Sequence, residues 1–212
     1  MIAVRWLAAS LVVILLTLQD LAASQPRVIT HAQFFSTETE QSQVVDPHVF
    51  VQDPTAPEAV GLLGIRHAAG LRPALVERDA ATLALYAADG RALGMNLGEW
   101  LRGTFSMKMT GSPGERRLDV TFSGLKPQGY YSLFERHSDQ RHVIFTPIDG
   151  TGKANSFAAK ADGTAKLSIA LARPLPATSA VVLIYHSDEQ AHGLERGRIG
   201  FDAHHLVMTR PQ

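Results

Sequence analysis

The feature that most constrains the fold is a strict alternation of apolar and polar residues on both sides of a short turn. Apolar residues occupy every second position over 105–110 and again over 118–123, with Gly-Ser-Pro-Gly-Glu between the two segments. Successive side chains of a β-strand point to opposite faces. The pattern therefore predicts an antiparallel hairpin with one apolar face and one polar face.

Other segments repeat this kind of signal along the chain. The continuous apolar run Val181–Tyr185 predicts a central strand that is covered on both faces. Further strands are expected at 82–87, 131–136, 141–146, 157–159, 165–171 and 201–208. About eight short strands with almost no amphipathic helix predict a mainly β fold, an antiparallel β-sandwich with Greek-key connections.

One short helix is expected near 97–102. Asn96 can accept from the first turn, and Glu99, three residues later, can reach back to the cap, as in a capping box. Leu97, Trp100 and Leu101 then lie on one face of the helix. We expect Trp100 to close one end of the core.

Residues 1–24 have the pattern of an export signal. Arg5 precedes an apolar run over 6–18, and small residues at 22–24 offer a cleavage site. The run is shorter than the roughly 20 residues of a membrane-spanning helix, although an uncleaved anchor is an alternative. The sequence thus predicts an exported protein, periplasmic or extracellular, with no membrane span after removal of the signal.

Residues 25–80 are expected to form an irregular N-terminal arm, and 81–212 the β-sandwich domain. Prolines interrupt the first half of the arm, which leaves room for short edge strands at 44–45 and 49–51. A short helix is possible over 58–69, although three glycines at 61, 64 and 70 weaken it.

Composition excludes several kinds of chemistry. The chain has no cysteine, so a thiolate nucleophile, a cysteine-based zinc site and a blue-copper centre are ruled out. Its 20 basic and 20 acidic residues balance, which leaves no electrostatic footprint for nucleic acid. Its nine histidines would become cationic in a mildly acidic medium.

Four segments together carry a resemblance to known proteins. LGEWL, GLKPQGYYSLFE, FTPIDGTGKANSF and YHSDEQAHG resemble a pattern of small secreted bacterial β-sandwich proteins of uncharacterised function, over about residues 83–208. GLKPQGYYSL is also similar to the strand-entry motif of fibronectin type III modules. The resemblance implies export and a β-sandwich and attaches no activity.

The candidate site residues lie where two predicted strands end. Both strands run into the tripeptide His-Ser-Asp, and alternation pairs Glu135 with His137 and His186 with Asp188. Of the adjacent histidines His204 and His205, only one can join a given site, because they point to opposite faces. The candidate binding residues are Tyr131, Glu135, His137, His186 and Asp188, and the candidate metal ligands are His137, His186, His192 and His205.

Three functions remain open. The first is a non-catalytic binding protein for an unknown small ligand or protein partner, whose strand-end histidines are structural. The second is a metal-binding protein, since imidazoles with a carboxylate suit zinc or copper(II). The third is a hydrolase in which Glu135 and Asp188 form an acid/base pair, which requires a separation of about 5–10 Å. No GxSxG or HExxH motif is present, and no residue is assigned as catalytic.

Overall fold

The computed structural model describes residues 27–112, 115–138 and 143–209, so the predicted export signal lies outside the described residues. Within these ranges the chain forms fifteen strands and two α-helices. Every pairing between the named strands is antiparallel. The predicted mainly β, antiparallel, sandwich-like fold is confirmed, with more strands than the sequence pattern indicated.

A six-stranded sheet forms the centre of the molecule. Its strands are β1 (Val28–Thr30), β10 (Tyr130–His137), β11 (Ile144–Pro147), β12 (Ser156–Ala158), β14 (Ala180–His186) and β15 (Ala203–Thr209). The order is β1-β15-β14-β10-β11, and β12 also pairs with β10. Every residue of β14 and β15 is buried, as predicted for the apolar run in β14.

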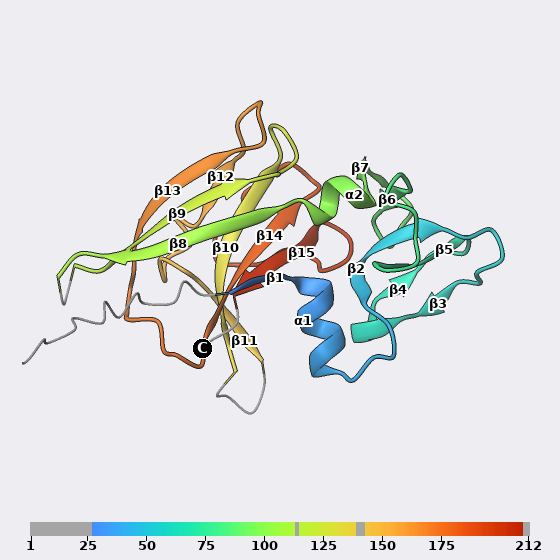
Figure 1. Cartoon of the computed structure of the whole chain (residues 1–212), viewed down its shortest axis with the longest axis horizontal. Coiled ribbons are helices and arrows are strands. Elements are labelled where there is room, and N and C mark those ends of the chain that lie inside the picture. Colours follow the sequence, from blue (N-terminus) through green and yellow to red (C-terminus); the bar gives the residue numbers. More distant parts are fainter. Residues whose placement is uncertain (1–26, 113–114, 139–142, 210–212) are drawn as a thin grey trace, which may run out of the picture.

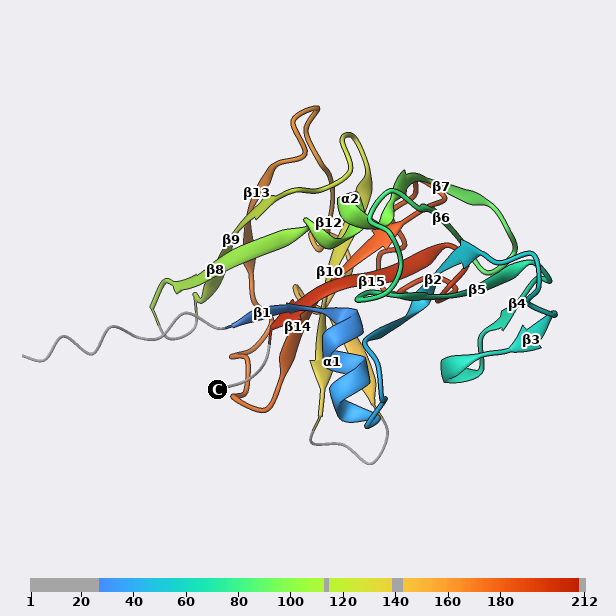
Figure 2. The same cartoon turned by 45° about the vertical axis from the view of Figure 1, so that its right-hand side comes forward.

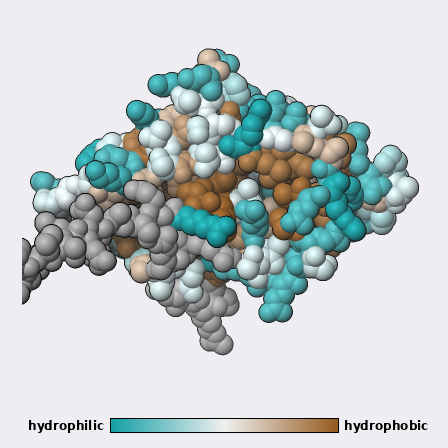
Figure 3. Space-filling view, viewed as in Figure 1, coloured by the Kyte–Doolittle hydropathy of each residue, from teal (hydrophilic) through white to brown (hydrophobic). Residues whose placement is uncertain are grey.

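A second sheet packs over one face of the first (Figure 1). It consists of β8 (Thr104–Thr110), β9 (Arg117–Ser123) and β13 (Ala165–Ala170), in the order β13-β9-β8. The predicted hairpin is β8–β9, with Phe105 opposite Phe122 and Met107 opposite Val120. Apolar side chains of both sheets form the main core, and Figure 3 shows apolar atoms at the centre of one face, surrounded by hydrophilic ones.

The segment expected to be an irregular arm is organised. It contributes β1, a helix and most of two further sheets, which lie to the right in Figures 1 and 2. The four-stranded sheet has the order β5-β2-β6-β7, and the two-stranded one pairs β3 with β4. Their bounds are β2 (Val45–Gln52), β3 (Ala59–Val60), β4 (Arg66–His67), β5 (Leu71–Leu75), β6 (Ala84–Tyr86) and β7 (Ala92–Asn96).

Two local features differ from expectation within this segment. The α-helix considered over 58–69 is replaced by β3, the 3-10 turn η1 (Leu62–Gly64) and β4, where Leu63 and Gly64 have positive φ angles of 56° and 73°. Left-handed backbone of this kind ends a right-handed helix. β2 is an interior strand rather than an edge, and Pro47, which has no N–H, lies at the irregularity in its pairing between Asp46 and Phe50.

Two helices complete the fold. The predicted one is α2 (Leu97–Leu101), which has the capping box between Asn96 and Glu99. Trp100 is buried, as expected, and its Nε1 donates to Asp46 Oδ2 at 2.9 Å. The other helix, α1 (His31–Glu38), lies against the second face of the large sheet beside β1 and β15 (Figure 2). Among the described residues, no helix has the length and apolar character to cross a membrane.

Candidate functional site

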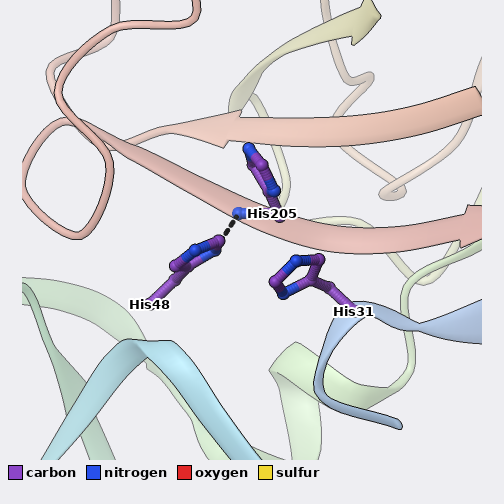
Figure 4. Close-up of side chains that lie close together, drawn as sticks. All are labelled: His31, His48 and His205. Carbon is purple, nitrogen blue, oxygen red and sulfur yellow. Dashed lines mark hydrogen bonds between the residues drawn. The ribbon is translucent and has the colours of Figure 1, made fainter. Parts of the chain in front are cut away.

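Three histidines from distant parts of the chain meet between α1, β2 and β15 (Figure 4). His31 is the first residue of α1, directly after its cap Thr30, while His48 lies in β2 and His205 in β15. All three side chains are buried. One ring nitrogen from each lies within 4.8 Å of the other two. We call this group and the cavity beside it the three-histidine pocket.

The three rings are packed closely. His31 and His48 are stacked with ring centroids 4.4 Å apart, and His205 meets both edge-on at 4.8 and 4.5 Å. The backbone N–H of His205 donates to His48 Nδ1 at 3.1 Å. Three buried nitrogens, His31 Nδ1, His48 Nε2 and His205 Nδ1, have no hydrogen-bond partner within the described ranges. We refer to them as the open nitrogens.

The contacts of the other nitrogens decide the tautomers of two rings. A backbone amide can only donate, so His48 Nδ1 carries a lone pair and the proton of the neutral ring is on Nε2. His205 Nε2 faces Arg196 Nη1 at 3.5 Å, and a guanidinium also can only donate, so the His205 proton is on Nδ1. Two of the open nitrogens are therefore N–H donors. A buried donor left unsatisfied costs about 1–3 kcal/mol.

The cavity beside the cluster has a volume of about 470 Å³. Its walls are mainly apolar, and two cations, Arg136 and Arg196, also line it. Leu63 and Val143 are exposed members of this lining, which places apolar surface at its rim. The buried or half-buried apolar lining residues are Phe34, Phe35, Ile65, Phe145 and Ile199.

The two arginines have different partners. Arg136 forms an ion pair with Glu38 at 2.7 Å and lies over the ring of Phe34. Arg196 is half-buried and stacks on Phe145, with 3.8 Å from its guanidinium carbon to the ring centroid. No carboxylate of the described residues forms an ion pair with Arg196. Burial lowers the pKa of Arg196.

Burial also keeps the three imidazoles neutral. Together with the nearby charges of Arg136 and Arg196, whose effect is smaller, it lowers the pKa of His31 to about 3. The pKa values of His48 and His205 lie well below their ordinary value, again mainly because of burial. At neutral pH the pocket therefore contains neutral imidazoles next to arginine charges.

A second group lies at the end of β14 and is called here the His–Asp–His cluster. His186 ends β14, and Asp188 and His192 follow in the next loop. One ligand atom from each lies within 4.8 Å of the others, and His192 Nε2 is 2.8 Å from Asp188 Oδ2. His186 Nε2 is 2.6 Å from Ser132 Oγ. Burial, then His192, lowers the pKa of His186 to about 4.

The remaining predicted site residues lie elsewhere. The two His-Ser-Asp ends could converge only if β10 and β14 were neighbours, and they are. The two strands are antiparallel, however, so His186 lies opposite Tyr130 and Val181 opposite Glu135. Five residues of strand correspond to about 17 Å. Glu135 and the His–Asp–His cluster are thus at opposite ends of the strand pair. Glu135 and Asp188 do not form the acid/base pair that a hydrolase would need.

Glu135 and His137 share one face, as alternation predicts, and both contact Arg173. His137 Nε2 is also 2.9 Å from Thr146 Oγ1. Tyr131 belongs to the main core, where its hydroxyl accepts from the Lys126 amide. The four candidate metal ligands therefore occupy three places: His137 alone, His186 with His192, and His205 in the three-histidine pocket.

The sequence did not single out His31 and His48. No short spacing such as HxH connects them to His205, because they lie 17 positions apart and far from the C-terminal strand. They come together only through the pairing of β1 with β15, which sets Val28 opposite Thr209, and the packing of β2 beside β15. Both contacts are between segments remote in sequence.

The fold and the cavity define this chain as an antiparallel β-protein with a pocket of small-ligand size. No protein-family model matches the sequence, and neither a curated protein nor a solved structure is significantly similar to it. The resemblance to small secreted bacterial proteins therefore stays a prediction. Function has to be assigned from the two histidine groups themselves.

Proposed function

We propose that the chain is a non-catalytic binding protein whose ligand is a small organic carboxylate held in the three-histidine pocket. The observation that carries this proposal is Arg196. Arg196 lines the cavity without a carboxylate partner among the described residues, and it faces the ring of His205, which carries one of the open N–H donors. A partly buried cation without a counter-ion is unfavourable, and a bound anion relieves that cost.

The donors suit a carboxylate in number and kind. A carboxylate has two oxygens that accept hydrogen bonds only, and a guanidinium binds it through parallel N–H donors. His48 and His205, which also line the cavity, carry the N–H groups on Nε2 and Nδ1 as further neutral donors. Since burial lowers the pKa values of both imidazoles, they donate without adding positive charge that would be expensive to bury.

The apolar lining of the cavity favours a ligand whose body, apart from the carboxylate, is apolar. Phe34, Phe35 and Phe145 present aromatic surface, and Ile65 and Ile199 present aliphatic surface. A cavity of about 470 Å³ falls within the usual range for small-molecule sites. A hydrocarbon or aromatic body attached to the carboxylate would bury apolar area against these side chains, which contributes favourably to binding.

A metal in the same pocket is the second candidate. It is favoured by the three open nitrogens and by the use of three histidines in zinc sites. Two observations oppose it. His48 Nδ1 accepts the His205 amide, so a metal on Nε2 would require loss of that proton or that hydrogen bond. Arg196 also places a positive charge next to His205, which repels a cation.

The expected location follows from the sequence alone. The pattern at 1–24 supports export to the periplasm or the extracellular space. A binding protein there would meet free carboxylates from the medium.

A ligand series with matched variants tests the proposal. We expect benzoate and octanoate to raise the melting temperature of the untagged protein and to bind in calorimetry, while benzamide and octanamide do not, because only an anion pairs with Arg196. Arg196→Gln should weaken carboxylate binding by at least about tenfold. Arg117→Gln, which removes a guanidinium that bonds Ser168 on the β9–β13 sheet, is the control and should bind normally.

Two results would overturn this assignment. One is the absence of binding by every carboxylate in the series, and the other is equal binding by the native protein and Arg196→Gln. Zinc binding that is abolished by His48→Gln would instead favour the metal in this pocket.

A further inference from the structure

We infer that His186, Asp188 and His192 form a zinc site, separate from the three-histidine pocket and independent of its ligand. Two imidazoles and a carboxylate are zinc ligands, and the three ligand atoms already lie within 4.8 Å of one another. Ligand atoms around a tetrahedral zinc ion are about 3.3–3.6 Å apart, given bonds of about 2.0–2.2 Å. Small side-chain movements would close the difference.

His186 is the best-prepared ligand of the three. It is completely buried, and its Nδ1 has no hydrogen-bond partner in the part of the chain that the structure describes. Its other nitrogen, Nε2, contacts Ser132 Oγ at 2.6 Å. A hydroxyl can accept as well as donate, so Ser132 can take the Nε2 proton in a hydrogen bond and leave the Nδ1 lone pair free for the metal. Outer partners of this kind orient the histidine ligands of metal sites.

This arrangement is the opposite of that at His48. There Nδ1 accepts from the His205 amide, which can only donate, so the proton is on Nε2, the open nitrogen. At His186 the partner is a hydroxyl, and the proton can be on the far side. Histidine is thus a hydrogen-bond donor in the three-histidine pocket, at His48, and a metal ligand in the His–Asp–His cluster, at His186.

Asp188 and His192 supply the remaining ligands from one short loop. The His192 ring stacks on His186 with centroids 4.8 Å apart and shares a hydrogen bond with Asp188. An ion would take the place of that shared proton, with the His192 proton moving to the other ring nitrogen. Both side chains are about one-fifth exposed, so water can occupy the fourth position.

The surrounding charges also favour a cation here. The carboxylate of Asp188 lies within the cluster itself, with 2.8 Å between its Oδ2 and His192 Nε2. The arginines nearby, Arg91 and Arg198, are each ion-paired with Asp202. The three-histidine pocket, by contrast, contains Arg196 without such a pair among the described residues.

Zinc titration of the untagged protein, after removal of metal with a chelator, tests this inference. We expect one zinc ion per chain by calorimetry and elemental analysis, and a rise in melting temperature, since binding only the folded state stabilises it. His186→Asn and Asp188→Asn should each weaken binding by at least about tenfold. Asp188 is a partly exposed loop residue, so its variant keeps the test valid if His186→Asn does not fold.

Matched controls separate the two sites. His48→Gln and Arg196→Gln should bind zinc as the native chain does, so failure of the carboxylate proposal would leave this one intact. Nitrogen-15 spectra of the labelled protein should show His186 coordinated through Nδ1 and protonated on Nε2. Absence of zinc binding, or binding that survives Asp188→Asn and His186→Asn but is lost in His48→Gln, would overturn the inference.

Discussion

His204 and His205 are consecutive residues of β15 that face opposite sides of the central sheet. His204 Nδ1 donates to the His48 carbonyl at 2.8 Å, and its Nε2 is 3.0 Å from Ser187 Oγ, so both nitrogens have partners. It packs against Trp100 and Tyr185 as part of the structure. His205 Nδ1 is one of the open nitrogens. Hydrogen-bond satisfaction, rather than residue type, separates the structural histidine from the candidate functional one.

The buried histidines should make the protein sensitive to acid. The folded-state pKa of His31, about 3, lies below its ordinary value of 6.5, so the unfolded chain binds its proton first as pH falls. Stability is therefore lost as pH decreases below 6.5. Between pH 7 and pH 5, His31 alone accounts for about 2 kcal/mol of this loss. Urea unfolding at both pH values measures the free energy of unfolding of the native protein and of His31→Gln. Its decrease from pH 7 to pH 5 should be smaller in the variant by that amount.

Asp46 provides a control of opposite sign. Burial raises its pKa to about 6, so the folded state binds this proton first and Asp46 favours folding as pH falls. Asp46→Asn should consequently enlarge the loss of stability between pH 7 and pH 5 by about 1 kcal/mol. Equal pH dependence in the native chain and both variants would contradict this account.

At the scale of elements, α2 shows how far local sequence controls structure. The helix has only five residues and begins with a complete capping box. Asn96 Oδ1 accepts from the Glu99 amide at 2.8 Å, and Glu99 Oε2 accepts from the Asn96 amide at 2.9 Å. These bonds satisfy backbone donors that a helix start leaves open. They also orient Trp100, whose indole reaches Asp46 in β2.

Removal of the cap should weaken the whole fold modestly. We expect Asn96→Ala to lower the free energy of unfolding by about 1 kcal/mol, because the cap loses its side-chain acceptor. Asn96→Ser, which keeps an acceptor, should lie close to the native value. Chemical denaturation of the three proteins measures this, and an alanine variant as stable as native would show that the contacts of Trp100 alone hold the helix.

At the scale of the whole molecule, Arg91 joins the four-stranded sheet to the C-terminal loop. From the turn between β6 and β7 it donates to the carbonyls of Ser187 and Phe201 at 2.8 and 2.7 Å, and it pairs with Asp202. The segment from 187 to 202 includes Asp188 and His192 of the His–Asp–His cluster, and Arg91 is one of the side chains that hold it. The same segment carries Arg196 on the side of the three-histidine pocket.

Arg91→Ala should loosen that segment more than the remainder of the protein. We expect a loss of about 1–2 kcal/mol in stability, because two carbonyls lose a charged donor at a partly exposed site. Hydrogen exchange followed by mass spectrometry should speed up at 187–202 and stay unchanged in β8 and β9. Arg102→Ala, which removes an exposed guanidinium at the C-cap of α2, serves as the control. Uniform exchange changes along the chain would argue against a local role.

Features that depend on residues close together in the chain could be predicted from the amino-acid sequence. Alternation determined the β8–β9 hairpin, the apolar run determined β14 as a central strand, and the spacing of Asn96 and Glu99 determined α2. The proximity of His186, Asp188 and His192 also follows from a short stretch of chain. In each case the period of the strand or the helix sets which side chains meet.

Features that depend on contacts between remote segments became visible in the folded molecule. The antiparallel register of β10 and β14 separated Glu135 from His186, although both strand ends carry the same tripeptide. The pairing of β1 with β15 and the packing of α1 and β2 beside β15 brought His31, His48 and His205 together. Local patterns fix the face of the sheet on which a side chain lies. Its neighbours across the sheet depend on which strands pair and in which register. The pairing and the register are settled only when the whole core forms.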